Sequence, residues 1–324
     1  MPQSNHTLII KILLPFFGIL LGFLLLETAF RFRHYYVRNI GFFDRLQFLG
    51  AGRDSLLGWK GKEYGLNLNA KKNIIVVGDS FTEGMGLETE YLYPTILAKK
   101  LSLNMLAYGG QGYGTLQQLL VLEKLVQKHP ADVVILQLCS NDFINNSFEL
   151  EKLSYWQNSA QYRPYLEGDE IVYRNAGWLP EWFLLISKFS RTIHFIAVRT
   201  PRLLSVMRGN SSVELVIAEQ GVRFAPFANS LLVTKKLIDK IKTTAAPARL
   251  ILFMADLSFS HEFTLFKKIA SDLGVTFVTD VSYDLEKARQ KGEKVTIDDN
   301  VHWSKAGHLL AANALSPYID KLVK

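Results

Sequence analysis

The feature that most constrains this chain of 324 residues is an apolar run near its start, LIIKILLPFFGILLGFLLL at residues 8–26. Its only charged residue is Lys11, close to the beginning of the run. A helix of this length spans about 28 Å, close to the roughly 30 Å hydrocarbon thickness of a bilayer. Pro15 and Gly18 fit this interpretation, because both residue types are more frequent in membrane helices than in soluble ones. The run therefore predicts one transmembrane helix within an N-terminal membrane anchor at residues 1–30.

A cleaved signal peptide is the alternative interpretation of this run. Its apolar core would be about 7–15 residues long and would be followed by a site of small residues. Here Glu27, Phe30 and Arg31 stand where small residues are needed. We therefore expect the segment to be retained and to be followed by a juxtamembrane connector at residues 31–70.

The orientation of this anchor is open. Basic residues follow the run at Arg31, Arg33, Arg38 and Arg45, whereas only Lys11 and the terminal amine precede or begin it. The positive-inside rule, read literally, keeps the carboxyl-terminal domain in the cytoplasm. An Arg-rich amphipathic stretch after an anchor can instead lie along the membrane surface, so either side of the membrane remains possible for the domain.

Composition excludes several other classes of protein. Hydrophobic residues make up 48% of the chain and aromatic residues 12%, which rules out a disordered protein. The single cysteine, Cys139, cannot form a disulfide within the chain. The net charge of +7 is spread along the sequence and gives a poor argument for nucleic-acid binding.

Beyond residue 71, short apolar runs alternate with helical stretches. Strands are predicted at residues 71–77, 104–107, 132–139, 249–255 and 275–278, and helices at 116–128, 229–243, 262–273 and 304–323. Runs of this kind are typical of strands that are buried on both faces. The pattern predicts a flavodoxin-like, three-layer α/β/α fold with a central parallel sheet over residues 71–324. Such folds place functional groups on the loops that leave the carboxyl ends of the strands.

The stretch at about 143–228 is too long for a simple loop, and we expect it to form an insertion, either a cap or a subdomain. Aromatic residues concentrate in it: Trp156, Tyr162, Tyr165, Tyr173, Trp178 and Trp182. These rings would form the core of the subdomain or line a substrate groove. Residues 187–208 combine basic and apolar side chains, which fits either a helix packed against the domain or an amphipathic segment on anionic lipid.

Three of the predicted strands run into sequences whose residues could take part in catalysis or binding. The first is followed by GDSFTEG, in which Ser80 lies between a strand end and a helix start and can expose its hydroxyl. The second is followed by YGGQGYGT, whose glycines leave backbone N–H groups available to a phosphate or an oxyanion. The third ends in CSND, where the amide of Asn141 is a neutral donor for developing negative charge. Taken singly, these sequences also fit an ordinary helix cap, a tight turn and an Asx-turn.

An Asp-x-x-His pair precedes the last predicted helix. Asp299 and His302 are three residues apart, so the carboxylate can reach the imidazole, fix its tautomer and stabilise the imidazolium. Asp298 is the fallback for Asp299, although a solvated loop carboxylate is the simpler interpretation. His308 is expected to be a helix-start or packing residue.

Together the four blocks resemble the SGNH (GDSL-type) hydrolase family over about residues 71–324, excluding the insertion. The resemblance implies that Ser80 is the nucleophile, that His302 is the general base and then the acid, and that Asp299 orients it. It also implies an oxyanion hole formed by the backbone N–H groups of Ser80 and Gly112 and by the side chain of Asn141.

Two positions depart from the pattern of that family. Ala107 stands where the second block often has Asn, and Cys139 stands where the third block often has Gly. Neither position belongs to the catalytic set that the resemblance implies.

Together with the predicted anchor, the resemblance predicts a membrane-anchored serine esterase or lipase-like hydrolase that cleaves an acyl or O-acetyl ester of a lipid or glycan through an acyl-enzyme. No metal and no cofactor are expected, since neither H-E-x-x-H nor C-x-x-C occurs. The expected partners are the ester substrate and the membrane, with no nucleic acid. An O-acyltransferase with the same site is the nearest alternative, because an acceptor hydroxyl can replace water if the site excludes water. A non-catalytic, membrane-tethered binding module is the second alternative.

Overall fold

The structure, a computed structural model, describes residues 5–38, 41–43, 62–65, 72–85, 87–154, 162–176, 181–187, 189–207, 212–256 and 260–323. The chain divides into two compact units. The first unit comprises residues 1–47 and 178–209, and the second comprises residues 48–177 and 210–324. The predicted insertion is therefore divided, because its middle part groups with the N-terminal segment.

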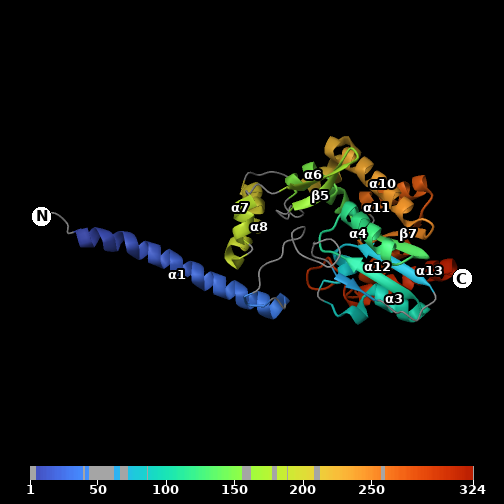
Figure 1. The fold of residues 1–324 in the computed structure, drawn as a ribbon, viewed down its shortest axis with the longest axis horizontal. Coiled ribbons are helices and arrows are strands. Elements are labelled where there is room, and N and C mark those ends of the chain that lie inside the picture. Colours follow the sequence, from blue (N-terminus) through green and yellow to red (C-terminus); the bar gives the residue numbers. More distant parts are fainter. Residues whose placement is uncertain are drawn as a thin grey trace. The chain divides into compact units, whose positions relative to one another are not determined.

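The first unit consists of helices. It contains α1 (Asn5–Arg38), α7 (Glu181–Ser187) and α8 (Arg191–Met207) (Figure 1). Within the described residues, one helical stretch is long and apolar enough to cross a membrane, Leu13–Tyr36, with a mean hydropathy of 2.1. The helix continues beyond the predicted anchor, so the first part of the predicted connector is helical as well.

The second unit is built on a six-stranded sheet. Its strands, in chain order, are β1 (Lys62–Tyr64), β2 (Asn73–Gly78), β3 (Asn104–Gly109), β4 (Val133–Leu138), β7 (Arg249–Met254) and β8 (Thr276–Val278). The spatial order is β1-β3-β2-β4-β7-β8, in which β1 is antiparallel to β3 and the other five strands are parallel. The five parallel strands follow the flavodoxin order 2-1-3-4-5. The predicted central parallel sheet is confirmed, and the edge strand β1 is an addition that the sequence pattern did not indicate.

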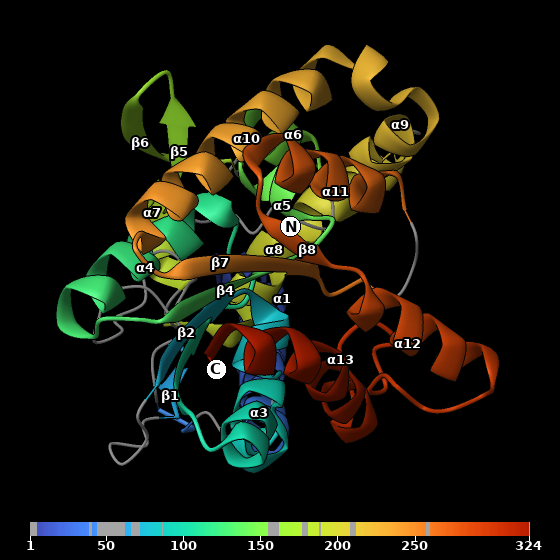
Figure 2. The same cartoon turned by 90° about the vertical axis from the view of Figure 1, so that its right-hand side faces the viewer.

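Helices cover both faces of this sheet, as Figure 2 shows. One face carries α4 (Thr115–Lys128), α10 (Ala225–Ala245) and α11 (His261–Leu273). The other carries α3 (Tyr93–Leu101), α12 (Asp280–Gln290) and α13 (Lys305–Val323). The predicted three-layer α/β/α arrangement is thus confirmed.

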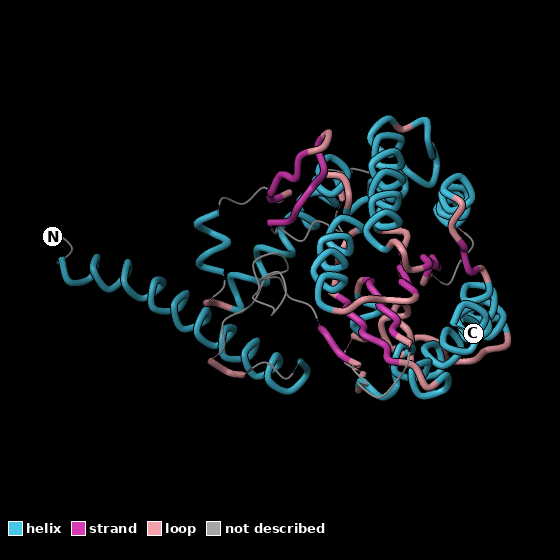
Figure 3. Tube along the Cα trace, turned by 45° about the vertical axis from the view of Figure 1, so that its right-hand side comes forward, coloured by secondary structure: helices cyan, strands magenta, loops and turns pink. Residues whose placement is uncertain are grey.

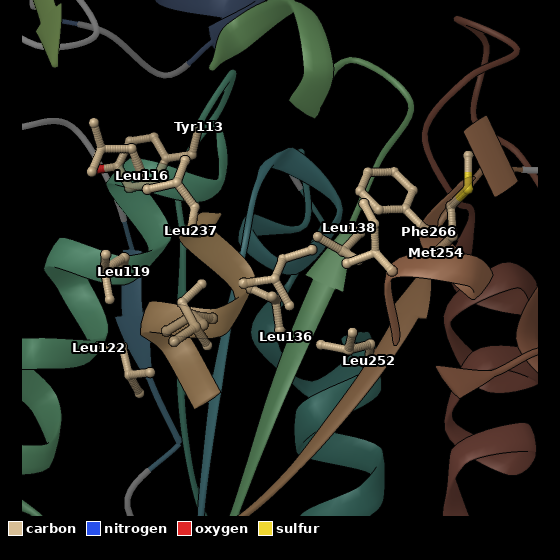
Figure 4. Close-up of a cluster of buried hydrophobic side chains, with 14 of the residues drawn as sticks. Tyr113, Leu116, Leu119, Leu122, Leu136, Leu138, Leu237, Leu252, Met254 and Phe266 are labelled. Carbon is tan, nitrogen blue, oxygen red and sulfur yellow. The ribbon is translucent and has the colours of Figure 1, made fainter. Parts of the chain in front are cut away.

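The layers follow from the alternation of side chains along each strand. Ile75 and Val77 of β2 face the core under α4 and α10, whereas Ile74 and Val76 face the core under α13. Figure 4 shows part of the first core, where leucines of α4 and α10 meet side chains of β4 and β7. Burying each such side chain contributes about 1.5–3 kcal/mol, so both faces hold the sheet in place.

Further elements leave the carboxyl end of β4. They are α5 (Asp142–Asn145), α6 (Phe148–Leu153), the strands β5 (Tyr162–Glu167) and β6 (Glu170–Asn175), and α9 (Val213–Gln220). The strands β5 and β6 form a separate antiparallel hairpin (Figure 3). Tyr165 is buried, whereas Tyr173 and Trp182 are largely exposed. Trp156 and Trp178 lie outside the described residues, as does the side chain of Tyr162.

Candidate active site

Ser80 begins the short helix α2 (Ser80–Glu83), directly after β2. Asp79 caps this helix, because its Oδ1 accepts a hydrogen bond of 2.9 Å from the backbone N–H of Phe81. The side chain of Gln137 on β4 accepts from the backbone N–H of Asp79 and from the hydroxyl of Thr82, both at 3.0 Å. The turn is therefore fixed before and after Ser80 by groups that lie beneath it.

Two glycines after β3 are required by geometry. A Cβ atom on Gly109 would lie 2.2 Å from the backbone nitrogen of Glu83, so only glycine lets β3 pass this close to α2. Gly112 has a φ of 72°, in the left-handed region that favours glycine. The glycine-rich sequence thus serves a close approach and a reversal of the backbone.

His302 lies in the loop between α12 and α13, and its ring reaches Ser80. The distance from Ser80 Oγ to His302 Nε2 is 2.8 Å, and that from His302 Nδ1 to Asp299 Oδ2 is 2.6 Å. Asp299 Oδ1 also accepts hydrogen bonds from the backbone N–H groups of Val301 and His302, at 2.8 and 2.9 Å. The three side chains form one continuous hydrogen-bonded chain.

The protonation pattern of this chain follows from Asp299. Burial alone would raise the pKa of Asp299, but the hydrogen bonds from the His302 ring and from two backbone N–H groups outweigh it and hold the pKa below its usual value. The ionised carboxylate can only accept, so Nδ1 of His302 carries the ring proton. Nε2 is then free to accept the proton of the Ser80 hydroxyl.

Aromatic neighbours hold the two loops together. Phe81 follows Ser80 and Trp303 follows His302, and their ring centroids are 5.1 Å apart. The ring of Phe81 also lies 5.1 Å from that of His302. Trp303 is buried and donates from Nε1 to the carbonyl of Ala255 at 3.0 Å. This packing sets the distance between the hydroxyl and the imidazole.

The two remaining residues of the predicted site follow the strands on either side of β2. Gly112 lies in the loop after β3, and Asn141 lies in the loop after β4. The register pairs Gly78 with Gly109, and the two neighbouring strands end at the same edge of the sheet. The structure therefore brings the loops of Ser80, Gly112 and Asn141 to one edge of the sheet.

The sequence analysis missed Asp256, which supports the Asn141 loop. Asp256 follows β7, and its carboxylate accepts from the backbone N–H of Ser140 at 2.8 Å and from the hydroxyl of Ser140 at 2.7 Å. Its position immediately after a predicted strand was a signal that could have identified it.

Arg163 was missed as well, and it supports the Gly112 loop. It projects from β5 and donates from Nη2 to the carbonyl of Gly112. Its Nη1 lies 2.6 Å from Glu151 Oε2, and both side chains are buried. No spacing in the sequence indicates this contact, because β5 and the Gly112 loop come together only in the folded chain.

The other polar residues near the predicted site have structural surroundings. Asp142 is buried and accepts from the backbone N–H of Cys139 at 2.7 Å and from the Thr115 hydroxyl at 3.0 Å. Burial lowers the pKa of His308 to about 3, and its ring packs against that of Trp303. Asp298 is 97% exposed and pairs with Lys294 at 2.9 Å, as expected for a solvated loop carboxylate.

Comparison with known proteins gives the class of the domain. Residues 74–176, about a third of the chain, match the family model described as GDSL-like Lipase/Acylhydrolase. This stretch contains Ser80, Gly112 and Asn141 and ends well before Asp299 and His302. This match to a GDSL-type domain agrees with the resemblance seen in the sequence, and it supports an enzyme that hydrolyses ester bonds. No curated protein matches the chain significantly.

Solved structures with some likeness to this chain include TesA and two esterases. One is described as TesA, with a TM-score of 0.44, 12% identity, and coverage of 78% of this chain and 99% of that one. A psychrotrophic esterase, EstA from Pseudoalteromonas sp., has a TM-score of 0.42 and 12% identity, covering 78% and 99%. Axe2, an acetylxylan esterase from Geobacillus stearothermophilus, has a TM-score of 0.39 and 12% identity, covering 77% and 94%.

Proposed function

We propose that this chain is a membrane-anchored serine esterase that cleaves an acyl or O-acetyl ester of a lipid or glycan. The observation that carries the proposal is the hydrogen-bonded chain from Ser80 through His302 to Asp299, at 2.8 and 2.6 Å. A weak nucleophile next to a base, with the base oriented by a third group, is the arrangement that activates a serine hydroxyl.

In the first step, Ser80 Oγ attacks the ester carbonyl carbon while its proton passes to His302 Nε2. The carbonyl oxygen becomes an oxyanion, which accepts hydrogen bonds from the backbone N–H groups of Ser80 and Gly112 and from the Asn141 amide. The carbon–oxygen bond to the alcohol then breaks, and the alcohol leaves with the proton from Nε2. An acyl group remains on Ser80.

In the second step, His302 Nε2 takes a proton from water while the water oxygen attacks the acyl carbon. The tetrahedral intermediate collapses, the bond to Ser80 Oγ breaks, and the proton returns to Oγ. The carboxylic acid is released and the resting site is restored. Asp299 keeps Nδ1–H in place throughout and stabilises the imidazolium in both steps.

The anchor in this proposal is α1. Within α1 the stretch Leu13–Tyr36 is long and apolar enough to cross a membrane, and the part that we assign to the bilayer is the run at residues 8–26, which ends before Glu27. The apolar side chains between Leu13 and Leu26 are largely exposed in the structure. A helix with such a surface is stable where lipid surrounds it. An enzyme held at a bilayer in this way meets ester substrates that are themselves held there.

The test compares the full chain in detergent with its Ser80→Ala variant on p-nitrophenyl acetate, butyrate and longer esters. We expect the variant to lose at least about 10³-fold in kcat, because the acyl-enzyme can no longer form. Equal rates in the two folded proteins would contradict the serine mechanism. Product that forms only after an alcohol acceptor is added would replace the esterase by an O-acyltransferase that uses the same site.

The adjacent carboxylates Asp299 and Asp298 offer a matched control. Asp299→Asn should lower kcat by about 10²–10⁴-fold, because the amide does not stabilise the imidazolium. Asp298→Asn should retain the parent rate, because that side chain points into solvent and pairs only with exposed Lys294. Equal losses in both variants would mean that the loop, rather than the His302 contact, determines the rate.

A further inference from the structure

The N-terminus of α8 is bound by a single carboxylate of α1. Glu27 Oε1 accepts from the backbone N–H of Arg191 at 3.0 Å, and Oε2 accepts from that of Thr192 at 2.9 Å. Oε2 also accepts from the hydroxyl of Ser190 at 2.8 Å. A carboxylate at this position satisfies N–H groups that have no partner within the helix, and it favours the positive end of the helix dipole.

Two further contacts hold α8 to α1 at the same level. Arg31 pairs with Glu27 at 2.7 Å and donates to the carbonyl of Phe189 at 2.6 Å, just before α8 begins. One turn into α8, the ring of Phe195 stacks on that of Phe30 with centroids 4.9 Å apart. The start of α8 is therefore fixed to a defined position along α1.

That position is the end of the apolar run. Leu26 is the last residue of the run at residues 8–26, and Glu27 follows it directly. In a bilayer, the first carboxylate after such a run lies at the level of the headgroups. Within the first unit, α8 runs across the direction of α1 rather than along it (Figure 1). A helix that leaves a membrane span crosswise at this level extends along the membrane surface.

The composition of this segment fits such a location. After Glu181, the first residue of α7, residues 182–208 contain no Asp or Glu. Their basic residues are Lys188, Arg191, Arg199, Arg202 and Arg208, of which Arg191 is buried. Apolar side chains on α7, on α8 and in the short segment between them are exposed, including Trp182 at 61%, Leu203 at 59% and Met207 at 74%. Other members of this exposed apolar set are Ile186, Phe189 and Ile196. Basic segments with such side chains bind the boundary between headgroups and acyl chains, where Trp is enriched.

We propose that α7 and α8 form an interfacial membrane-binding surface that lies on the leaflet reached by α1 at Glu27. Its exposed apolar side chains enter the acyl boundary, and Arg199, which is exposed, contacts anionic headgroups. The inference rests on the proposed anchor and goes beyond it, because it gives the enzyme a second contact with lipid. Such a surface fixes the height of α8 at the membrane in addition to tethering the chain.

The test uses the full chain with a Cys139→Ala background, reconstituted in phosphatidylcholine vesicles that contain phosphatidylglycerol. Single cysteines are placed at Leu203 and Met207, and an environment-sensitive fluorophore is attached to each. We expect lipids with a nitroxide on the upper acyl chain to quench these labels at least about twofold more than a label at Tyr283→Cys. Tyr283 is an exposed side chain of α12 in the second unit and serves as the matched control.

A label at Leu20→Cys separates failure of the inference from failure of the anchor. Leu20 is an exposed side chain in the middle of the apolar run. Quenching at Leu20 without quenching at Leu203 and Met207 would overturn the interfacial surface and leave the anchor in place, including the case in which α8 instead packs on protein. No quenching at any of these positions would overturn both.

The charge part of the proposal has its own variant. Arg199 is exposed on α8, and its guanidinium lies over the ring of Phe195 at 5.8 Å. We expect Arg199→Gln, or a change to pure phosphatidylcholine vesicles, to lower the quenching at Leu203. Quenching that is independent of both changes would show that apolar contact alone holds α8, which would overturn the assignment of anionic headgroups.

Discussion

At the scale of single residues, Asp79 is a carboxyl that folding keeps protonated. Burial raises the pKa of Asp79 from 3.8 to about 7, and the negative charge of Asp256 adds to the rise. Between these two pH values the folded state binds a proton that the unfolded state has released. The free energy of unfolding therefore falls as pH rises toward about 7, and above that value the loss is complete.

Asp79→Asn removes this dependence while keeping an oxygen that can cap α2. We expect the variant to be more stable than the parent at pH 8, by on the order of 2–4 kcal/mol, since one pKa unit corresponds to 1.36 kcal/mol. The difference in free energy of unfolding between variant and parent should shrink at pH 5, where the parent carboxyl is neutral. Urea unfolding of both proteins at pH 5 and pH 8 measures this difference. Asp142 and Asp256 are unchanged in the variant, so an equal difference at pH 5 and pH 8 would assign the effect to the hydrogen bonds and not to the charge.

At the scale of helices and strands, most of the correct predictions came from short local sequence patterns. The apolar runs at 71–77, 132–139 and 249–255 correspond to β2, β4 and β7, because strands buried on both faces have a pattern that needs no distant partner. Ser80, Asn141 and the pair of Asp299 and His302 could be named because they follow strands or precede a helix.

What the sequence did not indicate are contacts between distant segments. The strand β1 is three residues long and exists as a strand only through its pairing with β3. Glu27 and Arg191 are separated by 164 positions, and Arg163 and Gly112 by 51. Neither periodicity nor composition contains such pairings, since they depend on how the elements pack.

The β5–β6 hairpin gives a prediction at this scale, because Arg163 of β5 links it to the Gly112 loop. Arg163→Met should lower kcat on p-nitrophenyl acetate by about 10-fold or more, since a donor of the proposed oxyanion hole loses its support. It should also destabilise the fold by about 3–5 kcal/mol, because Glu151 is left buried without its partner.

A double variant separates these two effects. Arg163→Met combined with Glu151→Gln removes the buried charge, so unfolding should require more urea than for the single variant. The kcat should remain low if Arg163 positions Gly112. Recovery of the parent kcat in the double variant would limit Arg163 to a role in stability.

At the scale of the whole molecule, segments of the two units alternate along the chain. This arrangement predicts which fragments of the chain can fold on their own. We expect residues 48–177, joined to residues 210–324 by a Gly-Ser linker of about ten residues with a reach of about 18 Å, to fold without detergent. The excised chain should keep the parent rate on p-nitrophenyl acetate, because the residues proposed for the site all belong to the second unit.

The comparison for this experiment is a chain of residues 48–324. It keeps α8 but lacks Glu27, so Arg191, Thr192 and Ala197, which are buried in the full chain, lose their surroundings. We expect this chain to aggregate, as measured by light scattering. A soluble, active chain of residues 48–324 beside an unfolded excised chain would contradict the division into these two units.

The contact between Glu27 and α8 also has a consequence in time. Synthesis proceeds at roughly 5–20 residues per second, and Ser190 follows Glu27 by 163 positions. The ribosome therefore completes α1 about 8–33 seconds before α8 exists, and in that interval it makes β1 to β6, which belong to the other unit. About half of the chain is synthesised between Glu27 and the residues of α8 that it binds. The order of synthesis therefore requires α1 to form before α8 can bind to it.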